Sequence, residues 1–119
     1  MTASNRGPIT THILDLAEGQ PARGVGVRLE VADGGGAWTE LGAGRTDADG
    51  RLSDLLPPGS RLEARTYRLT FDTGAYFRAA GRPAFYPTVE VTFEISAPEE
   101  HHHIPLLLSR FGYTTYRGS

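Results

Sequence analysis

In Val25-Gly26-Val27-Arg28-Leu29-Glu30-Val31, apolar side chains occupy every second position, and this alternation indicates the fold class. The same alternation recurs in residues 67–71 (YRLTF) and 89–95 (VEVTFEI). A period of two places the apolar side chains on one face of a β-strand and the polar side chains on the other. Each of these segments therefore predicts a strand with one buried face and one face in water.

Further segments complete about seven or eight predicted strands. They cover residues 9–17, 37–45, 101–108 and 113–117. Turns rich in glycine and proline separate them, since the chain holds 15 Gly and 8 Pro. Only residues 73–81 (TGAYFRAAG) favour a short helix, with Thr73 as its N-cap and Gly81 as its stop. Many short antiparallel strands with one helix indicate an all-β sandwich.

The length of 119 residues predicts one domain that buries a core without disulfides, and the chain contains no cysteine. We expect a flexible N-terminal segment over residues 1–8 and a single domain over residues 9–119. The N-terminal segment lacks the apolar stretch of a secretory signal, and no apolar run approaches membrane-spanning length. We therefore expect a cytoplasmic protein with no membrane partner.

The charged residues do not favour a nucleic-acid partner. All 12 basic residues are arginine, and the formal net charge is −2. Arginine offers a forked donor that suits planar anions, although a compositional bias explains the lack of lysine more simply. The arginines form no basic stripe, so nucleic acid is not expected to bind. The absence of lysine also excludes Schiff-base catalysis and a phosphate-loop lysine.

The four histidines are the main candidates for chemistry, and His101, His102 and His103 are adjacent. In a strand, the first and third of these point to one face and the second to the other. The remaining histidine, His12, lies in the first predicted strand. Arg51 directly follows a turn (TDADG), so it begins a strand or loop.

Three interpretations of the histidines are open from the residues alone. They form a hydrogen-bonded or solvated set without a role, or they bind a metal, or they act in acid–base catalysis. His12, His101 and His103 could supply three nitrogens to an open zinc site, although no spaced motif such as His-Glu-x-x-His is present. Histidine changes charge near neutral pH, and a nearby arginine would keep it neutral as a base.

The last four residues, Tyr116-Arg117-Gly118-Ser119, combine an aromatic hydroxyl, a guanidinium group and a second hydroxyl. An apolar run, residues 104–108 (IPLLL), lies just upstream. Chain ends usually lose order, and sequence then matters little. We instead expect this end to pass along the core and to deliver its polar groups to a site.

Together these motifs resemble those of the 5-hydroxyisourate hydrolases, the transthyretin-like enzymes of urate degradation. The matching stretches are residues 11–15 (THILD), 19–22 (GQPA), 46–51 (TDADGR), 85–87 (FYP), 101–109 (HHHIPLLLS) and 116–119 (YRGS). The final tetrapeptide separates the hydrolases from the hormone-carrying transthyretins. The resemblance implies a transthyretin-like β-sandwich of two four-stranded sheets with one short helix. It also implies a homotetramer, a dimer of dimers with active sites in the channel between them, that needs no metal or organic cofactor.

The resemblance assigns catalysis to His12, Arg51, His103 and Ser119, and substrate binding to His12, Arg51, Tyr116 and Ser119. His12 and His103 would activate water and return a proton to the leaving ring nitrogen of 5-hydroxyisourate. Arg51 would hold substrate oxygens and stabilise the developing negative charge. The implied product is 2-oxo-4-hydroxy-4-carboxy-5-ureidoimidazoline.

A non-catalytic transthyretin-like carrier of a small planar ligand is the alternative function. Such a carrier would use the same channel but would not need His12, Arg51 and His103 together. A metal-dependent enzyme built on the histidine cluster is a third hypothesis, which loss of activity with a chelator would favour.

Overall fold

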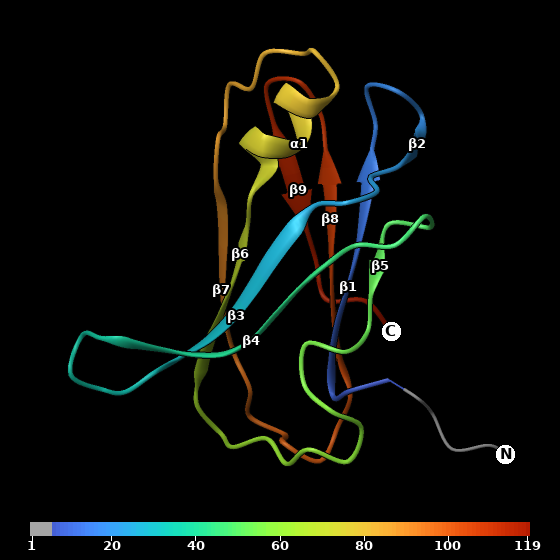
Figure 1. Ribbon diagram of the computed structural model, residues 1–119. Helices are drawn as coiled ribbons and strands as arrows, with labels where there is room; N and C mark the ends of the chain where they lie inside the picture. The colour runs from blue at the N-terminus through green and yellow to red at the C-terminus, as the bar shows by residue number, and fades with distance from the viewer. Residues whose placement is uncertain (1–5) are drawn as a thin grey trace, which may run out of the picture.

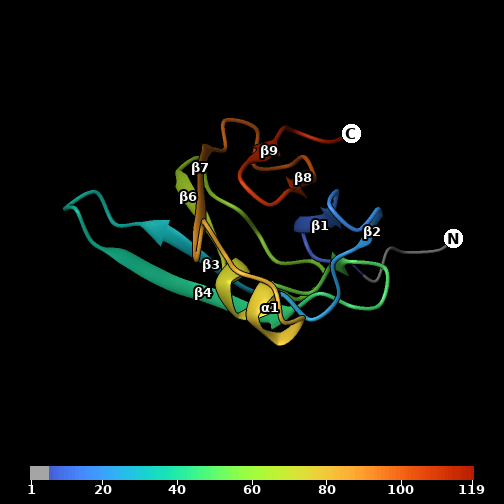
Figure 2. The same ribbon diagram turned by 90° about the horizontal axis from the view of Figure 1, so that it is seen from above.

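The computed structural model describes residues 6–119, which form two β-sheets and one short helix (Figure 1). Residues 1–5, most of the segment expected to be flexible, lie outside the described residues. Seen from above, the two sheets form separate layers (Figure 2). The prediction of an all-β sandwich with one helix is confirmed. Within residues 6–119, no helix is long and apolar enough to cross a membrane.

The first sheet contains β1 (Ile9–Asp15), β2 (Gln20–Pro21), β5 (Arg51–Leu52), β8 (His102–Leu108) and β9 (Tyr113–Thr115). Its order is β2-β1-β8-β9, and β5 also pairs with β1. Over the described residues this sheet has five strands, whereas four were expected. The sequence does not predict β2, because a strand of two residues is too short to show a period of two. The strands β1 and β8 run parallel, with Thr10 opposite His103 and His12 opposite Pro105.

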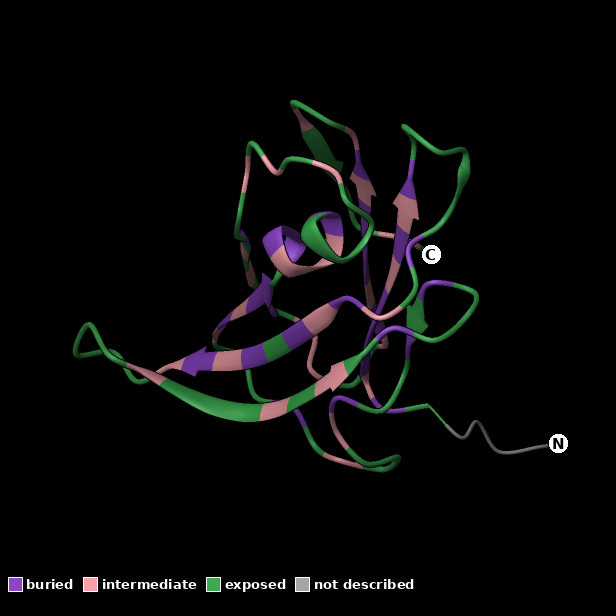
Figure 3. Ribbon diagram, turned by 45° about the horizontal axis from the view of Figure 1, so that its top comes forward, coloured by how far each residue is buried: buried purple, intermediate pink, exposed green. Residues whose placement is uncertain are grey.

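The second sheet contains β3 (Gly26–Ala32), β4 (Trp38–Arg45), β6 (Thr66–Phe71) and β7 (Val89–Glu94). Its order is β4-β3-β6-β7, and every pair is antiparallel. Figure 3 shows burial alternating along β3, whose Val27, Leu29 and Val31 are buried. The period of two in the sequence therefore marks the side chains that face the other sheet.

The core lies between the two sheets and draws aliphatic and aromatic side chains from both. Its fully buried members include Ile9, Ile13 and Leu106 from the first sheet, and Leu29, Leu69 and Phe71 from the second. Burying one such side chain contributes about 1.5–3 kcal/mol. Because the inward-facing positions are used for packing, the outer face of β1 and β8 is left for polar side chains.

The helix α1 (Thr73–Ala79) lies at one end of the sandwich (Figure 1) and forms where the sequence predicts it. The prediction of Thr73 as its N-cap is wrong, because the cap is Asp72. The Asp72 carboxylate accepts a hydrogen bond from the Ala75 backbone N–H at 3.2 Å. Thr73 is buried, and its hydroxyl donates to the Tyr86 carbonyl at 2.6 Å. Both residue types suit a cap, and the tertiary contact with Tyr86 decides between them.

A buried ion pair joins the end of β1 to the helix region. Asp15 is fully buried and accepts hydrogen bonds from the Tyr76 hydroxyl at 2.7 Å and from Arg82 at 2.6 Å. Burial alone raises the pKa of Asp15, but the hydrogen bonds from Arg82 and Tyr76 lower it overall. Burial and the neighbouring carboxylate raise the pKa of Tyr76 to about 12. Asp15 is therefore charged in the folded protein, and Tyr76 is neutral.

Replacing Asp15 by alanine is expected to lower the free energy of unfolding by about 2–4 kcal/mol, because Arg82 and Tyr76 lose their partner. The pKa of Asp15 in the folded protein lies below its value in the unfolded chain. The contribution of Asp15 is therefore present above about pH 4 and is lost as the pH falls through the folded pKa. Urea unfolding at pH 7 and pH 3 measures both effects. A stability difference that does not shrink at pH 3 would contradict this assignment.

The matched control for that experiment is Glu18→Ala. Glu18 is half-exposed, and its carboxylate lies 3.7 Å from Arg82. Exposed pairs of this kind contribute about 0–1 kcal/mol. The control should therefore unfold almost as the wild type does.

Candidate active site

A pocket on the first sheet gathers side chains from β1, β5, β8 and the chain end. Its volume is about 150 Å³. It is lined by Arg6, Thr10, Thr11, Arg51, Ser53, His103 and Ser119. His12 lies beside it, because the β1–β5 register places His12 opposite Arg51. Four residues that the sequence nominated for catalysis thus lie in one region of the fold.

The turn before β5 positions Arg51. The Asp47 carboxylate accepts hydrogen bonds from the backbone N–H groups of Asp49 at 2.9 Å and Arg51 at 3.0 Å. The hydrogen bond from the Arg51 backbone lowers the pKa of Asp47. Gly50 has φ +75°, and its carbonyl accepts from the Ile13 N–H at 2.7 Å. A side chain at Gly50 would collide with the Ile13 carbonyl, so this turn requires glycine.

The same turn sets the tautomer of His12. Its Nε2 lies 2.9 Å from the Asp49 carbonyl oxygen. A carbonyl oxygen only accepts, so Nε2 carries the proton and donates it. In the neutral ring, Nδ1 of His12 therefore keeps its lone pair and is able to accept a proton.

His103 and His101 share one face of the first sheet, as the strand period predicts. Their rings are stacked, with centroids 6.4 Å apart. His103 Nδ1 lies 2.7 Å from Thr10 Oγ1, and His101 Nε2 lies 3.0 Å from the same oxygen. His102 is buried, and its Nδ1 lies 3.0 Å from the Glu100 carbonyl oxygen. His102 therefore takes no part in the pocket.

Burial and positive charge both favour the neutral form of these histidines. Burial lowers the pKa of His103, and the charges of Arg51, His12 and Arg6 lower it further. Burial, followed by the charge of Arg6, also lowers the pKa of His101. At neutral pH, His103 is therefore an unprotonated imidazole, as a general base requires.

The chain end packs directly on His103. The Gly118 backbone N–H donates to the His103 carbonyl at 2.8 Å and forms an isolated β-bridge. A Cβ atom at Gly118 would lie 2.6 Å from Cδ2 of the His103 ring. Only glycine allows the backbone to lie this close, and Ser119 then reaches the pocket.

Tyr116 does not line this pocket. It lies beyond the end of β9 and lines a separate cavity of about 300 Å³ with Phe93 and His102. Its side chain is 54% exposed. Arg117 forms an exposed ion pair with Glu100 at 2.9 Å. Within one chain, Ser119 rather than Tyr116 therefore accompanies His103.

Sequence reasoning did not nominate Thr10 or Arg6. Thr10 stands two residues before His12, so the period of two places both on one strand face and could have revealed it. Arg6 belongs to the segment expected to be flexible, and no local pattern marks it. The Gly7 N–H donates to the Ser53 carbonyl at 2.7 Å, and the Pro8 carbonyl accepts from the His102 N–H at 2.9 Å. These two tertiary hydrogen bonds hold Arg6 beside the pocket.

The geometry does not support the zinc interpretation of the histidines. Across the described part of the chain, residues 6–119, no three His, Cys, Asp or Glu side chains lie close enough together to hold a metal ion. The arrangement instead places the imidazoles of His12 and His103 close to Arg51.

The two-layer fold and its histidine–arginine pocket define a transthyretin-like sandwich with a site on one sheet. The model of the HIUase/Transthyretin family matches residues 9–118, and the chain belongs to this family. The 5-hydroxyisourate hydrolase of Mus musculus is 46% identical over 98% of this chain and 99% of its own length. That of Caulobacter vibrioides is 47% identical over 93% of this chain and 97% of its own length.

Solved structures agree with this placement. The structure of Klebsiella pneumoniae 5-hydroxyisourate hydrolase has a TM-score of 0.81 at 38% identity, covering 93% of this chain and 97% of that one. Transthyretin from Sparus aurata has a TM-score of 0.85 at 36% identity, covering 95% and 97%. The predicted resemblance and the prediction that the chain is a hydrolase are thereby confirmed.

Proposed function

We propose that the protein hydrolyses 5-hydroxyisourate to 2-oxo-4-hydroxy-4-carboxy-5-ureidoimidazoline in urate degradation. The observation that carries the proposal is the meeting of Arg51, His103 and Ser119 in one pocket, with His12 beside it. The fold alone does not separate a hydrolase from a carrier, because sea bream transthyretin in complex with thyroxine shares it, with a TM-score of 0.86. A carrier has no need of His12, Arg51 and His103 gathered at one place.

The chemistry requires a base for water, a positive group for the oxyanion and a proton for the leaving nitrogen. His103 and Nδ1 of His12 are both able to take the water proton. The water oxygen then bonds to the ring carbonyl carbon, and Arg51 stabilises the negative charge on the carbonyl oxygen. The C–N bond breaks as a histidine returns the proton to the ring nitrogen. The Ser119 hydroxyl holds the substrate by a hydrogen bond.

We also propose the homotetramer, a dimer of dimers, as the working form. Large apolar side chains are exposed on the single chain, and they include Leu16, Phe85, Phe111 and Tyr113. The rings of Phe85 and Phe111 lie together, with centroids 5.7 Å apart, and contiguous exposed apolar side chains commonly mark a protein interface. Tyr116 keeps its proposed role in substrate binding only within such an assembly, because in one chain it lines another cavity.

The purified protein is expected to speed the loss of ultraviolet absorbance of freshly generated 5-hydroxyisourate above the spontaneous rate. The measurement is the decay of absorbance with and without protein, repeated after treatment with a chelator. Binding of the substrate without faster decay would favour the carrier. A rate lost with the chelator and restored by zinc would favour the metal-dependent alternative.

A further inference from the structure

Thr10 connects a histidine of the proposed active site to a histidine outside it. Its Oγ1 lies 2.7 Å from Nδ1 of His103 and 3.0 Å from Nε2 of His101. The side chain is buried, with Thr10 4% exposed, so bulk water does not compete for the hydroxyl. The parallel register of β1 and β8 places Thr10 opposite His103 and holds this contact.

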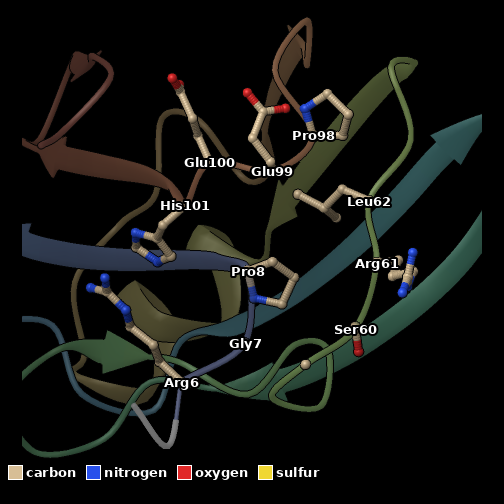
Figure 4. A pocket seen from close by; sticks show the side chains of 11 residues that line it. Arg6, Gly7, Pro8, Ser60, Arg61, Leu62, Pro98, Glu99, Glu100 and His101 are labelled. Atoms are coloured by element: carbon tan, nitrogen blue, oxygen red, sulfur yellow. The ribbon is translucent and has the colours of Figure 1, made fainter. Parts of the chain in front are cut away.

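His101 opens onto a second and larger cavity, of about 510 Å³. Arg6 lines both this cavity and the proposed active site, so the two are neighbours. Figure 4 shows the His101 ring and the Arg6 side chain on the same side of the larger cavity, with Glu99 and Glu100 nearby. Water in a cavity of this size is able to exchange protons with the His101 ring.

A threonine hydroxyl has one proton to donate and two lone pairs that accept. Thr10 therefore donates to at most one of the two imidazoles, and at least one imidazole must donate its own N–H to Thr10. When His103 donates from Nδ1 and Thr10 donates to His101, Nε2 of His103 is free to act as a base. In the opposite arrangement, Thr10 donates to Nδ1 of His103 and Nε2 of His101 donates to Thr10. The proton of the neutral His103 ring is then on Nε2. The two arrangements differ only in where the protons lie.

We propose that Thr10 is a positioning residue that sets the tautomer of His103 and relays protons between His103 and His101. The proposal rests on the proposed hydrolysis, whose new carboxyl group ionises at neutral pH and releases a proton. After His103 takes a proton at Nε2, its Nδ1–H bond breaks and an O–H bond forms at Thr10. The original O–H bond of Thr10 breaks as an N–H bond forms at Nε2 of His101. His101 then releases a proton from Nδ1 to water in the larger cavity. The same transfers run in reverse when Nε2 of His103 gives its proton to the leaving ring nitrogen and His101 takes a proton from that water, which restores the first arrangement.

The charges around the relay favour transfer over storage of the proton. Arg51 from β5, His12 from β1 and Arg6 from the N-terminal segment disfavour the imidazolium form of His103. Burial and the charges of Arg6, His103, His102 and Arg117 do the same for His101. A proton placed on either ring is therefore readily passed on.

The test compares Thr10→Val, which removes the hydroxyl at nearly constant shape, with Thr10→Ser, which keeps it. The first variant should lower kcat on 5-hydroxyisourate at least about tenfold with KM changed less than about twofold, and the serine variant should recover most of the loss. Thr70→Val is the control, because Thr70 is a buried threonine of the second sheet, and it should leave kcat unchanged. A wild-type kcat in Thr10→Val would overturn the proposal.

Two further readouts separate the relay from a structural role. Nitrogen NMR of the imidazoles should show one His103 tautomer in the wild type and in Thr10→Ser, but a mixture in Thr10→Val. His101→Gln should also lower kcat. Combining it with Thr10→Val should cause no further loss, because both substitutions interrupt the same path of proton transfer. An unchanged His103 tautomer in Thr10→Val would overturn the proposal. The NMR measurement needs no substrate, so an inactive wild type would contradict the hydrolysis and leave the tautomer prediction standing.

Discussion

His103→Asn is expected to lower kcat on 5-hydroxyisourate by about a hundredfold or more, the range that one general base contributes. Asparagine keeps a hydrogen-bonding group near the position of Nδ1, so the contact with Thr10 at 2.7 Å has a substitute. The substitution removes the ring nitrogen that is proposed to accept the water proton. Steady-state kinetics measures the effect, and denaturant unfolding should show nearly wild-type stability.

The matched control is the same substitution one position earlier, His102→Asn. His102 is buried on the opposite face, and its Nδ1 lies within hydrogen-bond distance of the Glu100 carbonyl, a bond that an asparagine amide also makes. Its kcat should stay within about twofold of the wild-type value. Equal losses in both variants would show that His103 acts through folding rather than chemistry.

The pH profile of the wild-type enzyme provides a second check on His103. The proposed base is the neutral ring of His103, so kcat/KM should fall as the pH drops through the pKa of His103. Burial and the charges of Arg51, His12 and Arg6 lower that pKa. The acid limb of the profile should therefore lie below the ordinary histidine value of about 6.5. An acid limb above that value would contradict His103 as the base.

Gly118→Ala is expected to lower kcat/KM at least about tenfold. The added Cβ atom would lie 2.6 Å from Cδ2 of His103 and 3.4 Å from Cγ of Pro105. Either the His103 ring or the chain end must then shift, and Ser119 leaves its place beside the pocket. Misplacing catalytic groups by about 1 Å is enough for losses of this size. Global stability should change little, because residues 116–119 extend beyond the last strand.

Gly112→Ala tests whether any added methyl group near the chain end has this effect. A Cβ atom there meets only the Ser109 Oγ at 3.6 Å, an ordinary contact. This variant should keep wild-type kcat/KM. A wild-type rate in Gly118→Ala would show that the chain end is not part of the active site. Tyr116→Phe in the same assay tests the proposed role of the Tyr116 hydroxyl in substrate binding.

The parts of the fold that the sequence predicts well are those with a local physical signal. The apolar alternation over β3, β6 and β7 requires only that neighbouring residues face opposite sides of a strand. The helix is likewise marked by a local break in that alternation. Its cap is not, because Asp72 and Thr73 are both good capping residues and only the contact with Tyr86 distinguishes them.

The pattern of residues predicts the all-β class and the opposite faces of His102 and His103, and the motifs predict the family and the candidate site residues. Three features became evident only in the folded chain: β8 lies parallel to β1, Thr10 bridges two histidines, and Ser119 rather than Tyr116 reaches the pocket within one chain. The two groups differ in the separation along the chain of the residues involved. The face of a strand depends on adjacent residues, whereas these contacts depend on register and packing between segments far apart in the chain.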